Sequence, residues 1–219
     1  MELKSETKNT QKSMDLVKNE QEHISYIKWL ERRSFRIALA STFTALSIVI
    51  GYLLAYLPNI ELFTLMIFLS GFILGKRDGV IVGFLSSFIF CFFNPLGASP
   101  LPLLTFQLIH YSLTGLFGAL IRNYFQLKIE INSDNDLYKF SIMIIFGFIG
   151  AFITLSFQIF SSLVDIFSYY GTLDQFLPYF LSGLGFTVIH IVGNTLSFIF
   201  ILPGLIQIIN KMLYMETKK

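Results

Sequence analysis

Charged residues are scarce in this sequence, and several long stretches have none. Asp, Glu, Lys and Arg make up 14% of the 219 residues, whereas soluble globular chains average about 25%. Hydrophobic residues make up 54%, and the mean hydropathy is +0.66. Uncharged stretches near the roughly 20 residues needed to cross a bilayer exclude an ordinary soluble domain. They predict an all-α, polytopic membrane protein.

Cysteine and tryptophan each occur once. Because Cys91 is alone, the sequence excludes an intramolecular disulfide and a cysteine-based metal site. Cys91 lies in an apolar run, where a free cysteine is usually a small buried hydrophobe. Trp29 precedes the first apolar run, and we expect it to anchor the chain at the membrane interface. The polar N-terminal segment, about 36 residues long, is too long for the start of a signal peptide, so the first apolar segment should remain in the mature protein.

Recognisable catalytic motifs are also missing. The sequence has no H-E-x-x-H, no G-x-S-x-G, no phosphate-binding Gly-Lys loop and no paired-Asp motif. A hydrolase that uses His110 or His190 as a base beside a serine such as Ser182 is therefore less well supported than a protein without catalytic activity. A channel would need pore-lining charges or a repeated filter sequence, which the sequence lacks. We therefore expect no enzymatic activity, no metal and no cofactor.

Six apolar segments are candidates for membrane-spanning helices. They cover residues 37–57, 62–75, 79–93, 101–121, 140–164 and 176–209. The second and third are short, so we expect neighbouring loop residues to extend them or the bilayer to thin locally. A four-span alternative, in which residues 62–93 form a re-entrant hairpin, stays open. The predicted organisation is a polar tail (1–35), a six-helix transmembrane domain (36–211) and a short C-terminal tail (212–219).

The distribution of basic residues predicts the topology. All 16 Lys and Arg lie in the N-terminal segment up to Arg36, the segments 76–78 and 122–139, or the C-terminal end from residue 210. The remaining loops, around residues 58–61, 94–100 and 165–176, have none. Lys and Arg concentrate in cytoplasmic segments of membrane proteins. We therefore expect a multi-pass protein of the cell membrane with both termini in the cytoplasm, and the four-span alternative gives the same orientation.

Small residues recur at helical spacing in two places. Gly71, Gly75, Gly79 and Gly83 are four residues apart and predict a tightly packed helical hairpin around the charged turn Lys76-Arg77-Asp78. The first apolar segment also has a face of small residues, formed by Ala38, Ser41, Thr42 and Ala45. Small residues let helices approach closely, so this face indicates either packing within the chain or docking of another membrane subunit.

Polar residues gather toward the predicted outer side of the membrane. Such residues usually face a protein interior or a cavity, and aromatic walls with a few converging polar groups are typical of small-molecule sites. An alternative is that Gln107, His110, His190 and Asn194 simply form hydrogen bonds across helices. Similarly, the role of Asn94 before Pro95 could be limited to forming a turn. As a group they predict a binding cup open to the outside. The candidates are Asn59, Glu61, Asn94, Gln107, His110, Gln158, His190 and Asn194.

Four sequence features resemble the S components of energy-coupling factor (ECF) transporters. They are R-I-A-L-A-S-T-F-T-A-L-S, G-F-I-L-G-K-R-D-G-V-I-V-G, F-F-N-P-L-G and H-I-V-G-N-T-L-S-F-I-F-I-L-P-G-L. The resemblance implies a six-helix bundle that captures a vitamin or related micronutrient from outside. It also implies partners: a membrane coupling subunit and two ATPase subunits. In that family small residues of the first helix contact the coupling subunit, and Ser41-x-x-x-Ala45 is the nearest match, with Ala38 and Thr42 beside it.

Two other functions stay open at this point. One is a membrane scaffold or assembly protein without a small-molecule site, and the other is a transporter that works alone. In each case we expect membrane lipid as a neighbour and no nucleic acid as a partner. The resemblance assigns the eight polar candidates to substrate binding, but the sequence does not specify the vitamin.

Overall fold

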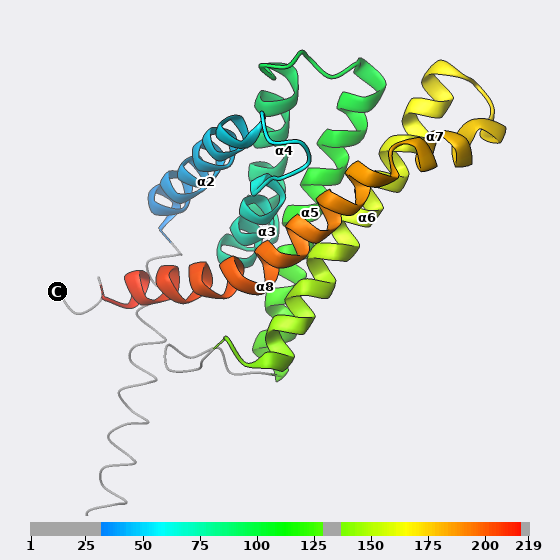
Figure 1. The fold of residues 1–219 in the computed structure, drawn as a ribbon. Helices are drawn as coiled ribbons and strands as arrows, with labels where there is room; N and C mark the ends of the chain where they lie inside the picture. Colours follow the sequence, from blue (N-terminus) through cyan, green and yellow to red (C-terminus); the bar gives the residue numbers. More distant parts are fainter. Residues whose placement is uncertain (1–31, 129–136, 216–219) are drawn as a thin grey trace, which may run out of the picture.

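The protein is described here by a computed structural model that covers residues 32–128 and 137–215 (Figure 1). No strand occurs in these two ranges, in agreement with the predicted all-α class. Most of the predicted N-terminal tail, with Trp29, lies outside the described residues, as do 129–136 and 216–219. The elements are α2 (Arg33–Leu54), α3 (Phe63–Leu74), α4 (Lys76–Phe92), α5 (Leu101–Lys128), α6 (Phe140–Tyr169), the 3₁₀ helix η1 (Leu173–Gln175), α7 (Phe176–Ser182) and α8 (Leu184–Met215).

Four of these helices, α2, α5, α6 and α8, are long and apolar enough to cross a membrane. The chain therefore has the composition and helix lengths of a multi-pass membrane protein. The two helices of the predicted hairpin, α3 and α4, are shorter. At 1.5 Å per residue, the 12 residues of α3 extend about 18 Å, against about 30 Å for the hydrocarbon core.

Helix α3 lies inside the bundle, where all 12 of its residues are buried. It packs against α2, α4, α5 and α8, and Figure 1 shows α8 crossing close to it. Phe68 and Phe72 of α3 belong to an aromatic core with Phe146 of α6 and Phe198 of α8. A helix that is hydrophobic on all sides is stable only when it is surrounded. Because other helices surround α3, its short length is compatible with an interior position.

Five glycines bring the backbones of α3, α4 and α5 together. A Cβ atom at Gly71 would overlap the carbonyl oxygen of Gly115, and one at Gly115 would overlap the carbonyl oxygen of Gly79. Similar overlaps with backbone atoms occur at Gly83 and Gly118. The predicted close packing of the hairpin is thus confirmed for Gly71 and Gly79, whereas Gly83 packs against α5 and an added Cβ at Gly75 would meet no atom within 4 Å. We call Gly71, Gly79, Gly83, Gly115 and Gly118 the glycine seam.

The turn of the hairpin is shorter than predicted. Gly75 alone reverses the chain, with a φ of 93°, and Lys76 already begins α4. Glycine adopts such positive φ values without a steric penalty. The charged residues predicted to form the turn are instead the first turn of α4. There the carboxylate of Asp78 is favoured by the partial positive charge of the helix N-terminus.

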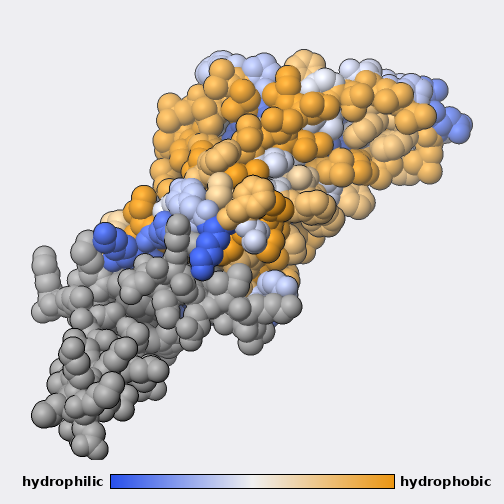
Figure 2. Space-filling model, turned by 60° about the horizontal axis from the view of Figure 1, so that its bottom comes forward, coloured by the Kyte–Doolittle hydropathy of each residue, from blue (hydrophilic) through white to orange (hydrophobic). Residues whose placement is uncertain are grey.

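Basic residues from several helices lie at one end of the bundle, which we call the basic end. Arg36 of α2 forms an ion pair with Asp78 of α4, with 2.6 Å between Nη2 and Oδ2. Arg122 of α5 donates from Nη1 to the carbonyl of Ile73 at 2.9 Å. Figure 2 shows a largely hydrophobic face whose strongly hydrophilic residues lie mostly toward its two ends. This arrangement is typical of a protein surrounded by lipid.

The last predicted span, residues 176–209, is divided into two helices. Helix α7 ends at Ser182, Gly183 lies between the two helices, and α8 runs from Leu184 to Met215, past Pro203. Residues of α7 are exposed or partly exposed. The hydroxyl of Tyr179 donates to Asp165 of α6 at 3.0 Å and holds α7 beside the end of α6. Hydropathy alone predicts a continuous helix at this position, because apolar residues continue on both sides of Gly183.

Candidate functional site

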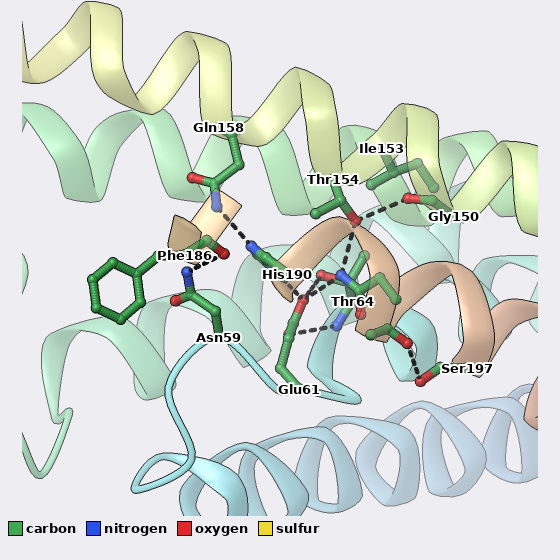
Figure 3. A network of polar contacts seen from close by, with 12 residues as sticks. Asn59, Glu61, Thr64, Gly150, Ile153, Thr154, Gln158, Phe186, His190 and Ser197 are labelled. Carbon is green, nitrogen blue, oxygen red and sulfur yellow. Dashed lines mark hydrogen bonds and ion pairs between the residues drawn. The ribbon is translucent and has the colours of Figure 1, made fainter. Parts of the chain in front are cut away.

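The loop between α2 and α3 places a carboxylate against α8. Asn59 has a φ of 55°, a left-handed conformation that asparagine tolerates better than most residues. Its Nδ2 donates to the carbonyl of Phe186 in α8 at 2.8 Å. This contact holds the loop on α8, and Glu61 then points toward α6 and α8 (Figure 3).

Glu61 lies one residue before the N-cap of α3, Leu62, and its side chain caps the first turn of this helix. The backbone N–H of Thr64 donates to Oε2 at 3.1 Å, and the Thr64 hydroxyl donates to Oε1. A carboxylate at this position satisfies an otherwise free helix N–H and lies at the positive end of the helix dipole. The cap therefore fixes the carboxylate at the start of the buried helix.

Two side chains of α8 donate to the same carboxylate. His190 Nε2 lies 3.1 Å from Oε1, and Asn194 Nδ2 lies 3.0 Å from it. The other ring nitrogen of His190, Nδ1, is 3.1 Å from Nε2 of Gln158 in α6. Because an amide nitrogen only donates, Nδ1 accepts from Gln158 and the proton is on Nε2, which donates to Glu61.

Asn194 is held on both sides and is only 1% exposed. Its Nδ2 also donates to Thr154 Oγ1 in α6 at 2.8 Å, and Thr154 in turn donates to the carbonyl of Gly150. These partners fix the amide orientation, so Oδ1 points away from them. Oδ1 is buried and has no partner among the described residues. We call the assembled residues the polar cluster: Glu61, Thr64, Thr154, Gln158, His190 and Asn194.

The cluster keeps Glu61 ionised at neutral pH. Burial raises the pKa of this carboxyl, but hydrogen bonds from His190, Asn194 and Thr64 outweigh burial and hold the pKa at about 2. The side chain is 19% exposed. Hydrogen bonds to the ionised form thus stabilise a negative charge at this position.

Aromatic rings connect the cluster to polar residues of α5. The ring centroid of Phe157 is 6.1 Å from that of His190 and 5.1 Å from that of His110. His110 Nε2 and Gln107 Oε1 are buried and have no partner among the described residues. Buried polar atoms are usually paired, so these two and Asn194 Oδ1 are available for a further contact.

The eight predicted site residues are distributed as follows. Four belong to the polar cluster, and Asn59 positions the loop that carries Glu61. Gln107 and His110 lie on α5 and are linked to the cluster through Phe157. Asn94 has another role, because its Oδ1 accepts from the N–H of Leu96 at 2.9 Å within the α4–α5 loop. Asn94 therefore stabilises a turn, which was the alternative that its position before a proline suggested.

Sequence reasoning missed Thr64 and Thr154. Thr64 follows Glu61 by three residues, the spacing of a helix cap, and Thr154 precedes Gln158 by four, one helical turn. Both spacings were visible in the sequence. A threonine in an apolar helix usually bonds to its own backbone, however, so spacing alone did not distinguish these two from the other threonines.

The predicted coupling residues lie on the outer face of α2. Ala38, Ser41, Thr42 and Ala45 are all exposed, whereas α2 buries Phe43, Ser47 and Gly51 against its neighbours. The Thr42 hydroxyl bonds to its own helix, to the carbonyl of Ala38 at 2.9 Å. The small-residue face is thus open to a neighbour in the membrane.

Comparison of the chain with protein-family models, with curated proteins and with solved structures gives no match. Within residues 32–128 and 137–215, no group of three or more His, Cys, Asp or Glu is arranged to hold a metal ion. The site is therefore interpreted from its own geometry. It has a partly exposed carboxylate, amide and imidazole groups around it, and aromatic rings beside it.

Proposed function

We propose that the protein is the substrate-capture subunit of an ECF-type importer, a six-helix S component that binds a vitamin or related micronutrient. One observation supports this most directly: residues of α6 and α8 gather around Glu61 of the α2–α3 loop and leave Asn194 Oδ1 buried without a partner among the described residues. An unpaired acceptor at a buried position costs stability. A ligand that donates to it would remove this cost.

The position of the polar cluster supports capture from outside. The cluster lies at the start of α3, whereas Arg36, Asp78 and Arg122 lie near its end. With the basic end in the cytoplasm, as the positive-inside rule predicts, the cluster lies toward the outer face of the cell membrane. Both termini then lie in the cytoplasm.

The free atoms indicate the chemistry of the ligand. Asn194 Oδ1 and Gln107 Oε1 are acceptors, and Glu61 is negative. Phe106, His110 and Phe157 provide ring faces and edges beside them. A planar ring with N–H donors or a positive charge fits this combination.

The exposed small-residue face of α2 supports the partner assignment. Ala38 and Thr42 present little side-chain volume, so a helix of a coupling subunit could approach closely along them. Energy for import would then come from two ATPase subunits bound to that coupling subunit. In this proposal, release follows from reorientation of the loaded subunit.

Native mass spectrometry of the gently purified full chain, exposed to a panel of vitamins, tests the proposal. We expect one ligand to be retained and its affinity to fall at least tenfold in Gln107→Leu and His110→Phe. These two side chains have free atoms outside the hydrogen bonds of the cluster, so the fold should persist. Thr105→Val, on the exposed side of the same helix, is the matched control. Recovery of lipid alone across the panel would argue strongly against the proposal.

A scaffold without a ligand is the second candidate, favoured by the mutual hydrogen bonding of the six cluster residues. Such a network could serve only to join α3, α6 and α8. A scaffold predicts that Gln107→Leu and His110→Phe leave cellular uptake unchanged and do not reduce stability, because each removes an unpaired buried atom. If the chain supports uptake but purifies without associated ATPase subunits, a transporter that works alone would instead be favoured.

A further inference from the structure

A groove runs between α2 and α4, on the side of the bundle away from α6. Its volume is about 610 Å³, and in Figure 1 the two helices lie side by side at the edge of the bundle. Its walls are mainly apolar or small: Ile37, Ala40, Ser41, Thr44, Ala45 and Ile48 on α2, and Ile81, Leu85 and Ile89 on α4. The side chains of Ile37, Ile81 and Leu85 are more than 40% exposed, so the groove opens laterally.

One end of the groove is strongly basic. Arg33, Arg36 and Arg77 line it together with a single acid, Asp78. Asp78 is already paired with Arg36 at 2.6 Å, so two guanidinium groups exceed the negative charge there. The N-termini of α2 and α4 lie at the same end, and helix N-termini favour anions.

We propose that this groove binds one anionic phospholipid, with its phosphate between Arg33 and Arg77 and an acyl chain along the apolar walls. From Arg33 to Ile48 the groove extends about 22 Å along α2, at 1.5 Å per residue. This exceeds the roughly 15 Å half-thickness of the hydrocarbon core, so it accommodates a chain from headgroup depth to the bilayer centre. Basic pockets between membrane helices are typical headgroup sites.

The lipid site overlaps the small-residue face of α2 in part. Ala38 and Thr42 do not line the groove, whereas Ser41 and Ala45 lie at the boundary of both surfaces. A lipid in the groove would thus form part of the edge against which a neighbouring subunit packs. The site is independent of the polar cluster, so the absence of a vitamin ligand would not affect this inference.

Native mass spectrometry of the full chain tests the lipid site, with added phosphatidylglycerol or phosphatidylcholine. We expect one phosphatidylglycerol to remain at collision energies that remove phosphatidylcholine. The double variant Arg33→Gln/Arg77→Gln should weaken phosphatidylglycerol binding roughly 30-fold, because each basic residue near an anionic headgroup contributes about fivefold. Thr44→Phe, which fills the groove, should remove the bound lipid whichever headgroup is offered.

The matched control is Lys139→Gln/Lys211→Gln, which removes two charges at exposed positions outside the groove. It should bind phosphatidylglycerol as the unmodified chain does. Equal retention of both lipids, or equal weakening by the control, would show general attraction to anionic lipid and overturn the proposal. A retained protein chain or a dimer, lost in Thr44→Phe, would assign the groove to a protein and also overturn it. Thermal unfolding of each variant verifies that the fold persists.

Discussion

The glycine seam and the polar cluster are both buried, but different interactions hold them. In the seam, the backbones of α3, α4 and α5 touch with no room for a Cβ atom. In the cluster, His190 and Asn194 of α8 donate to a carboxylate at the start of α3, and side chains of α6 hold these two residues through further hydrogen bonds. The glycine seam has no polar side chains, whereas the cluster has a polar atom, Asn194 Oδ1, that lacks a partner among the described residues.

This difference suggests that one part of the bundle is a rigid support and the other is adjustable. Glycines of α6 also face α8, but a Cβ at Gly147 or Gly150 would meet the side chains of Ile199 or Phe198 rather than backbone. Side chains change rotamers far more readily than backbones move. Opening for a ligand is therefore easier between α6 and α8 than within the α3–α5 block.

We expect the largest effect from a substitution that disrupts the glycine seam. Gly115→Ala would place its methyl group against the carbonyl of Gly79, and backbone has to shift to admit it. Overpacking typically costs about 1–3 kcal/mol, and we expect at least about 3 kcal/mol here. The measurement is the free energy of unfolding in detergent. Gly185→Ala, where no atom lies within 4 Å of the added group, is the control and should be neutral or slightly stabilising.

The second prediction compares alanine substitutions at two asparagines. Asn194→Ala removes donors to Glu61 and Thr154 from a buried site, and we expect a loss of about 2–3 kcal/mol because one bond is to a charged group. Asn94→Ala removes one contact in an exposed loop turn and should cost about 0.5 kcal/mol. Equal losses in chemical unfolding would show that the cluster adds no more stability than a surface turn.

The third prediction uses pH to isolate the charge of Glu61. The folded pKa, about 2, lies below the ordinary value of 4.5, so ionisation stabilises the fold above pH 4.5, and this contribution disappears as pH falls toward 2. Glu61→Gln lacks it at every pH. We expect the unmodified chain to be more stable than this variant by about 1–2 kcal/mol between pH 5 and 7, with the difference shrinking below pH 4.5. A difference that does not change with pH would mean that the charge is not stabilised by the cluster.

The contrast between seam and cluster also explains what could be predicted from the sequence. Glycine spacing indicated close packing of α3 and α4, because four-residue intervals place residues on one helix face. Hydropathy indicated the long apolar helices. Neither signal identifies which helix meets that face, and so the role of α5, with Gly115, was not foreseen. The break at Gly183 was also missed, because apolar residues continue on both sides of it.

For the site, composition indicated the residues but not their contacts. Asn94 and Asn194 look equivalent as uncharged amides near the same side of the membrane. Only the packing of α6 against α8 distinguishes them, because it encloses Asn194 between Glu61 and Thr154. The same enclosure made Thr154 part of the cluster. Tertiary contacts of this kind depend on helix rotation, which a single sequence specifies poorly.

The smallest expected effect concerns Thr154, the α6 residue that accepts a hydrogen bond from Asn194. Thr154→Val keeps the shape of the side chain but removes the hydroxyl that accepts from Asn194. We expect a loss of about 1 kcal/mol and, if a ligand binds Asn194 Oδ1, a several-fold weaker affinity because the amide is less firmly oriented. Thr105→Val removes a hydroxyl that bonds only to its own helix in α5 and should change neither quantity. If Thr154→Val reduces stability but leaves ligand affinity unchanged, the ligand does not bind near Asn194. The polar cluster would then serve, like the glycine seam, only to hold helices together.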